Sequence, residues 1–190
     1  MRRPNICVFT GSNPGAKQDY SAAAEQLAAE LVSRDLGLVY GGAKIGLMGI
    51  IADEVLRQGG EAIGVMPNHI ANNGVAHEKL TQLYLVDSMH ERKAKMSSLA
   101  SGFIAMPGGG GTMEEIFEVF TWAQLGLHSK PCGLLNVSHY YDHLRAFMRH
   151  ATDEKFMKPA HLEMLMIRNN PKDLLDAFDQ YQPNSEDKWY

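Results

Sequence analysis

Short runs of apolar residues alternate with longer segments of mixed polarity along most of the chain. Several runs are rich in β-branched or aromatic residues and have the length of buried strands, at residues 5–10, 36–40, 62–66, 83–86, 103–106 and 132–136. The segments between and after them place apolar residues three or four positions apart, which predicts helices at residues 20–34, 47–58, 91–100, 112–127, 140–151 and 171–181. Strands that alternate with helices form βαβ units, so the pattern predicts an α/β fold, a Rossmann-like doubly wound parallel sheet in a single domain.

Length and composition fit one domain. The chain has 190 residues, 45% of them hydrophobic, which is enough for one sizeable core. We assign residues 1–181 to the domain and expect residues 182–190 to form a disordered tail. The formal net charge of -4 disfavours a nucleic acid or a membrane surface as partner, since both require a basic face.

The cysteines and the N-terminal segment bear on the compartment. Cys7 and Cys132 each lie inside an apolar run and lack the spacing of metal ligands, so we interpret both as core thiols in a reducing environment. Met1-Arg-Arg-Pro is not followed by the apolar region of a signal peptide, and no apolar run approaches the length of a membrane span. We therefore expect a cytoplasmic protein.

The segment Met106-Pro-Gly-Gly-Gly-Gly-Thr-Met-Glu-Glu115 joins a predicted strand to a predicted helix through consecutive glycines. Glycine removes the Cβ atoms that would keep a ligand away from the backbone, and a helix N-terminus offers unpaired amides with a partial positive charge. The pattern predicts an anion site. Since the chain has neither a P-loop nor a dinucleotide fingerprint after its first strand, we expect a mononucleotide or a sugar phosphate.

A capping box is an alternative interpretation of Thr112-Met-Glu-Glu115. In that motif Thr112 would cap an amide of the first turn and Glu115 would cap back, so both residues would serve only to start the helix. A cap needs no run of glycines, which favours the ligand site. Because a carboxylate one turn into a phosphate loop repels the phosphate, we expect Glu115 to face another part of the ligand.

Further glycine turns follow other predicted strands, at Gly11-Ser-Asn-Pro-Gly15 and Gly41-Gly-Ala-Lys-Ile-Gly46. Parallel strands end at the same edge of a sheet, so we expect these turns to flank the glycine loop. The basic pair Arg92-Lys93 opens a helix at the same edge, where cations oppose the helix dipole unless an anion compensates them. A solvated helix face is the alternative interpretation of this pair.

These motifs together resemble the Lonely Guy (LOG) family of cytokinin riboside 5'-monophosphate phosphoribohydrolases, many of which were once labelled lysine decarboxylases. The family pattern Pro-Gly-Gly-x-Gly-Thr-x-x-Glu is met from Pro107 to Glu115, and Met-x-x-Arg-Lys is met by Met89-His-Glu-Arg92-Lys93. The stretch from Thr121 to Asn136 is also similar to the family, and the likeness extends over residues 6–181.

The resemblance implies a Rossmann-like fold, a homodimer with its site near the interface, and no need for a metal or another cofactor. It implies that Arg92 and Glu115 are catalytic. Gly74 stands where many relatives carry Glu, a departure that bears on recognition of the base or its N6 substituent rather than on the reaction. The positions that it implies for substrate binding are Ser12, Gly42, Met89, Arg92, Lys93, Gly108, Gly109, Gly110, Gly111, Thr112, Met113, Glu114 and Thr121.

The reaction implied is hydrolysis of the N-glycosidic bond of an adenosine 5'-monophosphate, N6-modified or not, to the free base and ribose 5-phosphate. The alternative is a carrier that binds a nucleotide or a phosphorylated cofactor without turnover, because a fold alone does not separate the two. Glu115 favours the enzyme, since a pure phosphate binder gains nothing from a carboxylate. A decarboxylase dependent on pyridoxal phosphate requires a Schiff-base lysine, and no lysine in the sequence has a recognisable setting for it.

Overall fold

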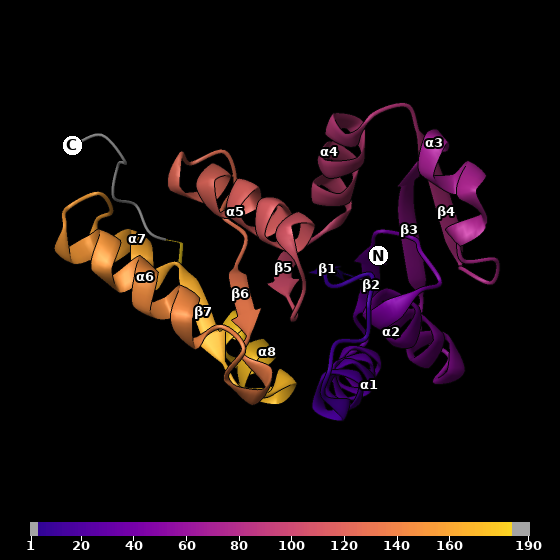
Figure 1. Ribbon diagram of the computed structural model, residues 1–190, viewed down its shortest axis with the longest axis horizontal. Coiled ribbons are helices and arrows are strands. Elements are labelled where there is room, and N and C mark those ends of the chain that lie inside the picture. Colours follow the sequence, from indigo (N-terminus) through magenta and orange to yellow (C-terminus); the bar gives the residue numbers. More distant parts are fainter. Residues whose placement is uncertain (1–3, 184–190) are drawn as a thin grey trace.

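The computed structural model describes residues 4–183, and in this range it contains a parallel sheet of seven strands. The strands pair in the order β4-β3-β2-β1-β5-β6-β7 (Figure 1). This arrangement confirms the predicted doubly wound α/β fold. The strands are β1 (Asn5–Phe9), β2 (Gly37–Tyr40), β3 (Ala62–Pro67), β4 (Gln82–Val86), β5 (Gly102–Ala105), β6 (Cys132–Leu135) and β7 (Leu165–Arg168).

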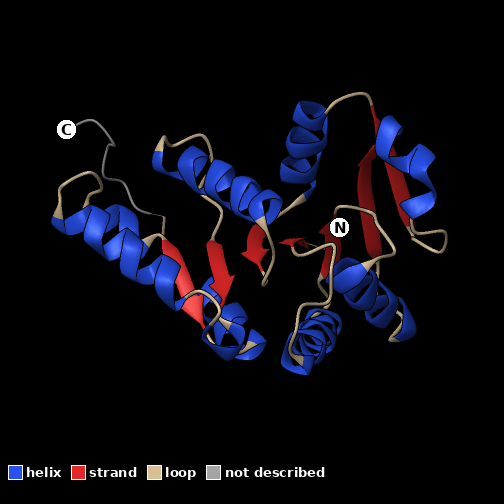
Figure 2. Ribbon diagram, in the orientation of Figure 1, coloured by secondary structure: helices blue, strands red, loops and turns tan. Residues whose placement is uncertain are grey.

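Helices cover both faces of this sheet (Figures 1 and 2). One face carries α1 (Gln18–Ser33), α2 (Gly46–Arg57) and α8 (Pro171–Asp179). The other face carries α4 (Met89–Leu99), α5 (Gly110–Gln124), α6 (Asp142–Asp153) and α7 (Pro159–Glu163). Shorter turns are α3 (Asn68–Ile70), the π-helical Ala71–Val75 and the 3-10 turn Val137–His139. Among residues 4–183, no helix combines the length and the apolar character that crossing a membrane requires.

Successive strand residues enter two different apolar cores. In β1, Ile6 and Val8 pack into the core beneath α1, α2 and α8, whereas Cys7 and Phe9 pack into the core beneath α4, α5 and α6. A strand that is buried on both faces is largely apolar, which explains why the central strands read as nearly continuous apolar runs. The buried polar residue of β1, Asn5, donates a hydrogen bond from Nδ2 to the carbonyl oxygen of Leu99 at 3.0 Å. Cys7 and Cys132 are free and buried, so their interpretation as core thiols is confirmed.

Some elements differ from the sequence-based expectation. The last strand, β7, was not predicted, because it is a short edge strand that pairs with β6 alone and is only partly buried. Helix α5 begins at Gly110 rather than at residue 112, and α6 begins at Asp142 rather than at residue 140. Glycine has a poor helix propensity, so propensity places the start of α5 too late. Of the predicted tail, residues 184–190 lie outside the described range.

Strand order reverses between β1 and β5. From β1 the chain passes through α1 to β2 on one side, while β5 pairs with β1 on the other side. At such a switch point the loops that leave the two strands diverge and open a crevice beyond their carboxyl ends. The turn that starts at Thr10 and the glycine loop that starts at Met106 leave these two strands, so both lie at the crevice.

Candidate active site

The three glycine turns lie against one another at the carboxyl edge of the sheet. A Cβ atom on Gly108 would collide with the side chain of Thr112 and would lie 2.9 Å from the amide nitrogen of Gly11. A Cβ on Gly46, where φ is 57°, would collide with the backbone of Ser12. The turns after β1, β2 and β5 therefore meet at one place, as their positions after parallel strands predicted.

The other glycines of the loop have no comparable packing role. A Cβ on Gly109, Gly110 or Gly111 would have no heavy atom within 4 Å apart from its chain neighbours and the backbone of its own helix. All three residues line a cavity of about 320 Å³. Gly109 is the N-cap of α5, and the next two glycines form its first turn, where amides have no acceptor within the helix. Open space, free amides and the positive end of a helix dipole are the features of an anion site.

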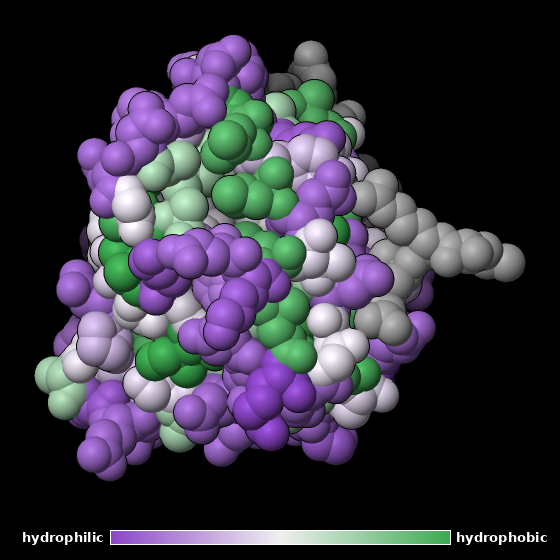
Figure 3. Space-filling view, turned by 90° about the vertical axis from the view of Figure 1, so that its right-hand side faces the viewer, coloured by the Kyte–Doolittle hydropathy of each residue, from purple (hydrophilic) through white to green (hydrophobic). Residues whose placement is uncertain are grey.

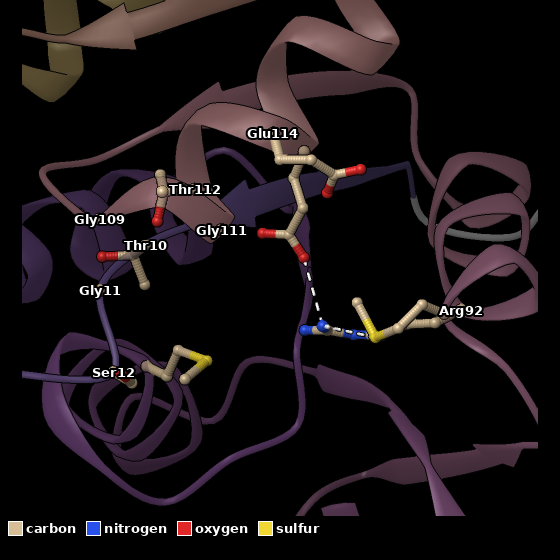
Figure 4. Close-up of a pocket in the computed structure, with 12 residues that line it drawn as sticks. Thr10, Gly11, Ser12, Arg92, Gly109, Gly111, Thr112 and Glu114 are labelled. Atoms are coloured by element: carbon tan, nitrogen blue, oxygen red, sulfur yellow. Dashed lines mark hydrogen bonds and ion pairs between the residues drawn. The ribbon is translucent and has the colours of Figure 1, made fainter.

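Thr112 and Glu115 do not form a capping box. Because α5 begins after the N-cap Gly109, Thr112 lies inside the first turn, and no side chain caps the helix. Thr112, which is labelled in Figure 4, is buried against Gly108, while the carboxylate of Glu115 forms an ion pair with Arg92 on α4. The capping-box interpretation of these residues is therefore wrong.

Arg92 and Glu115 form an ion pair at the wall of the cavity. Oε1 of Glu115 lies 3.4 Å from Nη1 of Arg92, and their side chains are 10% and 13% exposed, respectively. Nε of Arg92 donates a hydrogen bond to the carbonyl oxygen of Val65 at 3.1 Å. A Cβ on Gly41 would collide with the guanidinium, so this glycine makes room for it. Arg92 is thus fixed at the cavity, and the solvated-face interpretation is wrong for this residue.

Glu115 is buried and incompletely paired. Its Oε1 atom has no hydrogen-bond partner among the described residues. Burial raises the pKa of this carboxyl above its ordinary value, and the Arg92 guanidinium opposes the rise only in part. A carboxylate in this state has free capacity to accept a hydrogen bond or a proton from a ligand or a water molecule. Such perturbed groups in a cavity are typical of catalytic residues.

Lys93 is directed to carboxylates rather than to the open space of the cavity. Its Nζ atom lies 2.5 Å from Oε1 of Glu114 and 3.0 Å from Oε1 of Glu118, and its side chain is 10% exposed. The hydrogen bond to Glu114 is the main cause of the raised pKa of Lys93. This cation therefore links α4 to α5 next to the pair formed by Arg92 and Glu115.

The structure brings most of the predicted positions to the cavity wall. From the turn after β1 comes Ser12, and from α4 come Met89 and Arg92. From the glycine loop and α5 come Gly109, Gly110, Gly111, Thr112, Glu114 and Glu115. Figure 4 shows that the residues lining the cavity come from separate elements around one space. Sequence analysis missed Thr10 and Met48, which also line the cavity but carry only the pattern of a strand end and of an apolar helix position.

Other predicted positions lie away from this wall. Gly108 lines an adjoining cavity of about 250 Å³, which shares Gly109 with the first. Gly42 is buried in the turn after β2, where φ is 81°. Met113 and Thr121 are half-buried on α5 and, like Lys93, do not line the cavity.

Residues 48–178 match the family described as "Possible lysine decarboxylase". Over 182 residues the chain is 44% identical to cytokinin riboside 5'-monophosphate phosphoribohydrolase LOG5 of Arabidopsis thaliana, covering 96% of this chain and 80% of that protein. It is 45% identical over 181 residues to LOG1 of the same plant, with coverages of 95% and 85%. A probable phosphoribohydrolase of this kind from Oryza sativa subsp. japonica, LOGL5, is 46% identical over 182 residues, with coverages of 96% and 74%.

Solved structures of similar fold include molybdenum cofactor proteins. The molybdenum cofactor binding protein from Rippkaea orientalis has a TM-score of 0.72 and 19% identity, covering 95% of this chain and 98% of that chain. The molybdenum cofactor carrier protein from Chlamydomonas reinhardtii has a TM-score of 0.72 and 17% identity, with coverages of 94% and 98%. At these identities the likeness shows the fold alone.

Proposed function

Because the chain belongs to the LOG family of cytokinin riboside 5'-monophosphate phosphoribohydrolases, we propose that it hydrolyses adenosine 5'-monophosphate, with or without an N6 substituent, to the free base and ribose 5-phosphate. One observation carries the proposal. The buried Glu115 carboxylate faces Arg92 in the same cavity as the open glycines at the start of α5. That cavity offers a place for a phosphate and, one helical turn away, a carboxylate for the ribosyl ring.

The chemistry requires a negative charge beside the ribose. When the C1'–N9 bond breaks, its electron pair leaves with the base, which takes up a proton from solvent, and positive charge develops on the ribosyl ring. An ionised Glu115 stabilises this charge and removes a proton from the water whose oxygen bonds to C1'. Because the carboxylate is buried, water screens its attraction to the ribosyl cation only weakly. The Arg92 guanidinium lowers the pKa of this carboxyl and so helps to keep it ionised despite its burial.

The glycines hold the other end of the substrate. We assign the 5'-phosphate to the amides of Gly109, Gly110 and Gly111, whose missing side chains leave open space rather than serve packing. The chain as a whole has a formal net charge of -4, so an anion must be attracted locally. The helix N-terminus supplies that local attraction.

A direct assay tests the proposal. Purified protein is incubated with AMP and, in parallel, with an N6-prenylated AMP, and the released base and ribose 5-phosphate are separated by chromatography. Release of base by the wild type and not by Glu115→Gln supports the enzyme. Nucleotide binding without release of base would instead indicate a carrier.

A pyridoxal phosphate enzyme fits the site less well. Schiff-base formation needs a neutral amine, whereas the hydrogen bonds from Lys93 to Glu114 and Glu118 raise the pKa of that lysine. An absorbance scan after incubation with pyridoxal phosphate checks this point, because an internal aldimine has its own absorption band. We expect no such band.

We also propose a homodimer. Ile45, Leu85 and Met89 are 41%, 54% and 36% exposed and come from the turn after β2, from β4 and from α4. Figure 3, which views this side of the molecule, shows apolar side chains gathered among hydrophilic ones. Met89 also lines the cavity, so a second copy on this side would lie near the site. Light scattering during size-exclusion chromatography measures the oligomeric state, and a monomer at micromolar concentration would contradict this proposal.

The cytoplasm is the compartment that we propose. Cys7 and Cys132 are both unpaired thiols, which fits a reducing environment. Cell fractionation with an antibody against the chain tests the location.

A further inference from the structure

The turn between β5 and α5 is held by its carbonyl groups. The carbonyl oxygens of Met106, Pro107 and Gly108 each accept a hydrogen bond from a group outside the turn. Their donors, in that order, are Oη of Tyr141 at 2.6 Å, the amide of Gly11 at 3.1 Å and Oη of Tyr140 at 2.6 Å.

A held carbonyl fixes the direction of the amide that follows it. In a trans peptide the C=O and N–H groups point in opposite directions, and the described chain has no cis peptide bond. Because the carbonyl of Gly108 points to Tyr140, the amide of Gly109 points away from Tyr140. Among the described residues, this amide donates no hydrogen bond to a backbone or side-chain acceptor, so it is available to a ligand.

The backbone before the two tyrosines is strained so as to present them to the loop. Ser138 and His139 are consecutive non-glycine residues with left-handed φ angles of 48° and 63°. Asn136 secures this turn, because its Oδ1 atom accepts a hydrogen bond from the amide of Tyr141 at 2.7 Å and its Nδ2 atom donates one to Asp142 at 2.9 Å. Strain that surrounding bonds maintain is typical of functional turns.

The Tyr140 ring is placed independently of its hydroxyl. It packs edge-on against the ring of Tyr20, with centroids 5.9 Å apart, and against that of Tyr141, with centroids 5.0 Å apart. Tyr140 is 41% exposed and lines the adjoining cavity beside Gly108 and Gly109. Removing the hydroxyl alone therefore releases the loop carbonyl while leaving the ring in position.

We propose that Tyr140 is a positioning residue for the phosphate site, because its hydroxyl holds the Gly108 carbonyl and thereby turns the Gly109 amide toward the bound anion. The identity of that anion as a 5'-phosphate rests on the proposed function. Tyr140 acts on the anion indirectly, because its hydroxyl contacts the carbonyl of Gly108 in the loop.

The test is Tyr140→Phe, with ribose 5-phosphate and adenine as separate probes in isothermal titration calorimetry. We expect roughly three- to tenfold weaker binding of ribose 5-phosphate, the effect of one lost hydrogen bond, and unchanged binding of adenine. With AMP as substrate, the loss should appear in KM and not in kcat, because the phosphate is bound equally before and in the transition state. Tyr20→Phe is the matched control, since it removes a hydroxyl from the same cavity wall, and thermal unfolding reports on the fold of both variants.

Equal affinity of Tyr140→Phe and the wild type for ribose 5-phosphate would overturn the inference. The same holds for an equal loss in Tyr20→Phe, for a parallel loss of adenine binding, and for a wild type that binds no ribose 5-phosphate. If ribose 5-phosphate binding weakens as expected but the wild type releases no base from AMP, the inference stands and the proposed function fails.

Discussion

Oε1 of Glu115 lies 3.4 Å from Nη1 of Arg92. Beside this buried ion pair, the adjacent residues of the two helices, Lys93 and Glu114, form a second one. There, Oε1 of Glu114 lies 2.5 Å from Nζ of Lys93. In the outer pair the contact is short, Glu114 is partly exposed and Lys93 does not line the cavity, whereas in the inner pair the contact is longer and both residues line the cavity. The outer contact thus ties α4 to α5, and the inner contact leaves both charges able to engage a substrate.

Glu115→Gln should lower kcat at least about a hundredfold while AMP binding changes little. The amide keeps the shape of the side chain but has no charge for the ribosyl cation and no basicity for water, an effect of about 2.7 kcal/mol or more on the barrier. Steady-state kinetics and calorimetry measure the two quantities. Glu163→Gln, at an exposed position on α7, is the matched control. Activity within about tenfold of the wild type would rule out a catalytic carboxylate.

Gly110→Ala should stabilise the protein and weaken phosphate binding. Alanine fits a helix start where a Cβ meets nothing within 4 Å, so unfolding should cost about 0.4–1 kcal/mol more. The same Cβ reduces the space at the amides, and we expect the KM for AMP to rise about tenfold. Thermal unfolding and kinetics check both effects. Gly108→Ala provides the contrast, because its Cβ collides with Thr112 and should destabilise the fold. An unchanged KM in Gly110→Ala would contradict the assignment of the phosphate to this position.

Arg92→Lys should fail as a conservative change. Arg92 contacts the Val65 carbonyl through Nε and Glu115 through Nη1. A lysine has a single terminal nitrogen and cannot reproduce both contacts in this geometry. We expect kcat/KM to fall by roughly ten- to a hundredfold, the effect of losing charge-assisted hydrogen bonds. A loss in KM indicates ground-state binding, and a loss in kcat indicates a contact that tightens in the transition state. Arg149→Lys on the exposed side of α6 serves as the control, and wild-type kinetics in both Arg92→Lys and Arg92→Ala would exclude a role for this residue.

The acidic limb of the pH profile should lie above the range of an ordinary glutamate. The reaction needs ionised Glu115, and burial raises the pKa of that carboxyl, so protonation removes activity at a higher pH than the usual value of about 4.3. Arg92 lowers this pKa, and therefore Arg92→Met should shift the limb of kcat/KM further upward. Profiles of kcat/KM between roughly pH 4 and 8 measure the acidic limb of the wild type and that of Arg92→Met. A limb at or below 4.3 in the wild type would contradict the assignment.

Lys93→Met distinguishes a phosphate contact, which the family resemblance implies, from a link between helices, which the ion pairs indicate. We expect the second outcome, with stability lower by about 1 kcal/mol and the affinity for ribose 5-phosphate within about threefold of the wild type. The double variant Glu114→Gln/Glu118→Gln should reproduce that stability loss. A tenfold loss of ribose 5-phosphate affinity in Lys93→Met, without an equal loss in the double variant, would show a direct contact.

Local patterns were sufficient for most of the elements and for the candidate chemistry. The apolar runs of β1 and β5 are signals within a few residues, because strands buried on both faces admit few polar positions. The glycine loop is equally local, since Gly109, Gly110 and Gly111 have no packing role that distant residues could reveal. The basic Arg92 at a helix start and Glu115 one turn into α5 stood out for the same reason, as charges in unusual places along the chain.

By itself, then, the sequence determined the parallel α/β class and singled out the glycine loop and the two charged residues, Arg92 and Glu115, as a candidate site. Only the tertiary structure decided that Arg92 meets Glu115, because this contact depends on how α4 and α5 pack on one face of the sheet. It also decided that α5 starts at Gly110 and that Tyr140 holds Gly108, through a left-handed turn at Ser138 and His139. Positive φ angles are uncommon for residues other than glycine, and two in succession are maintained here by the surrounding contacts.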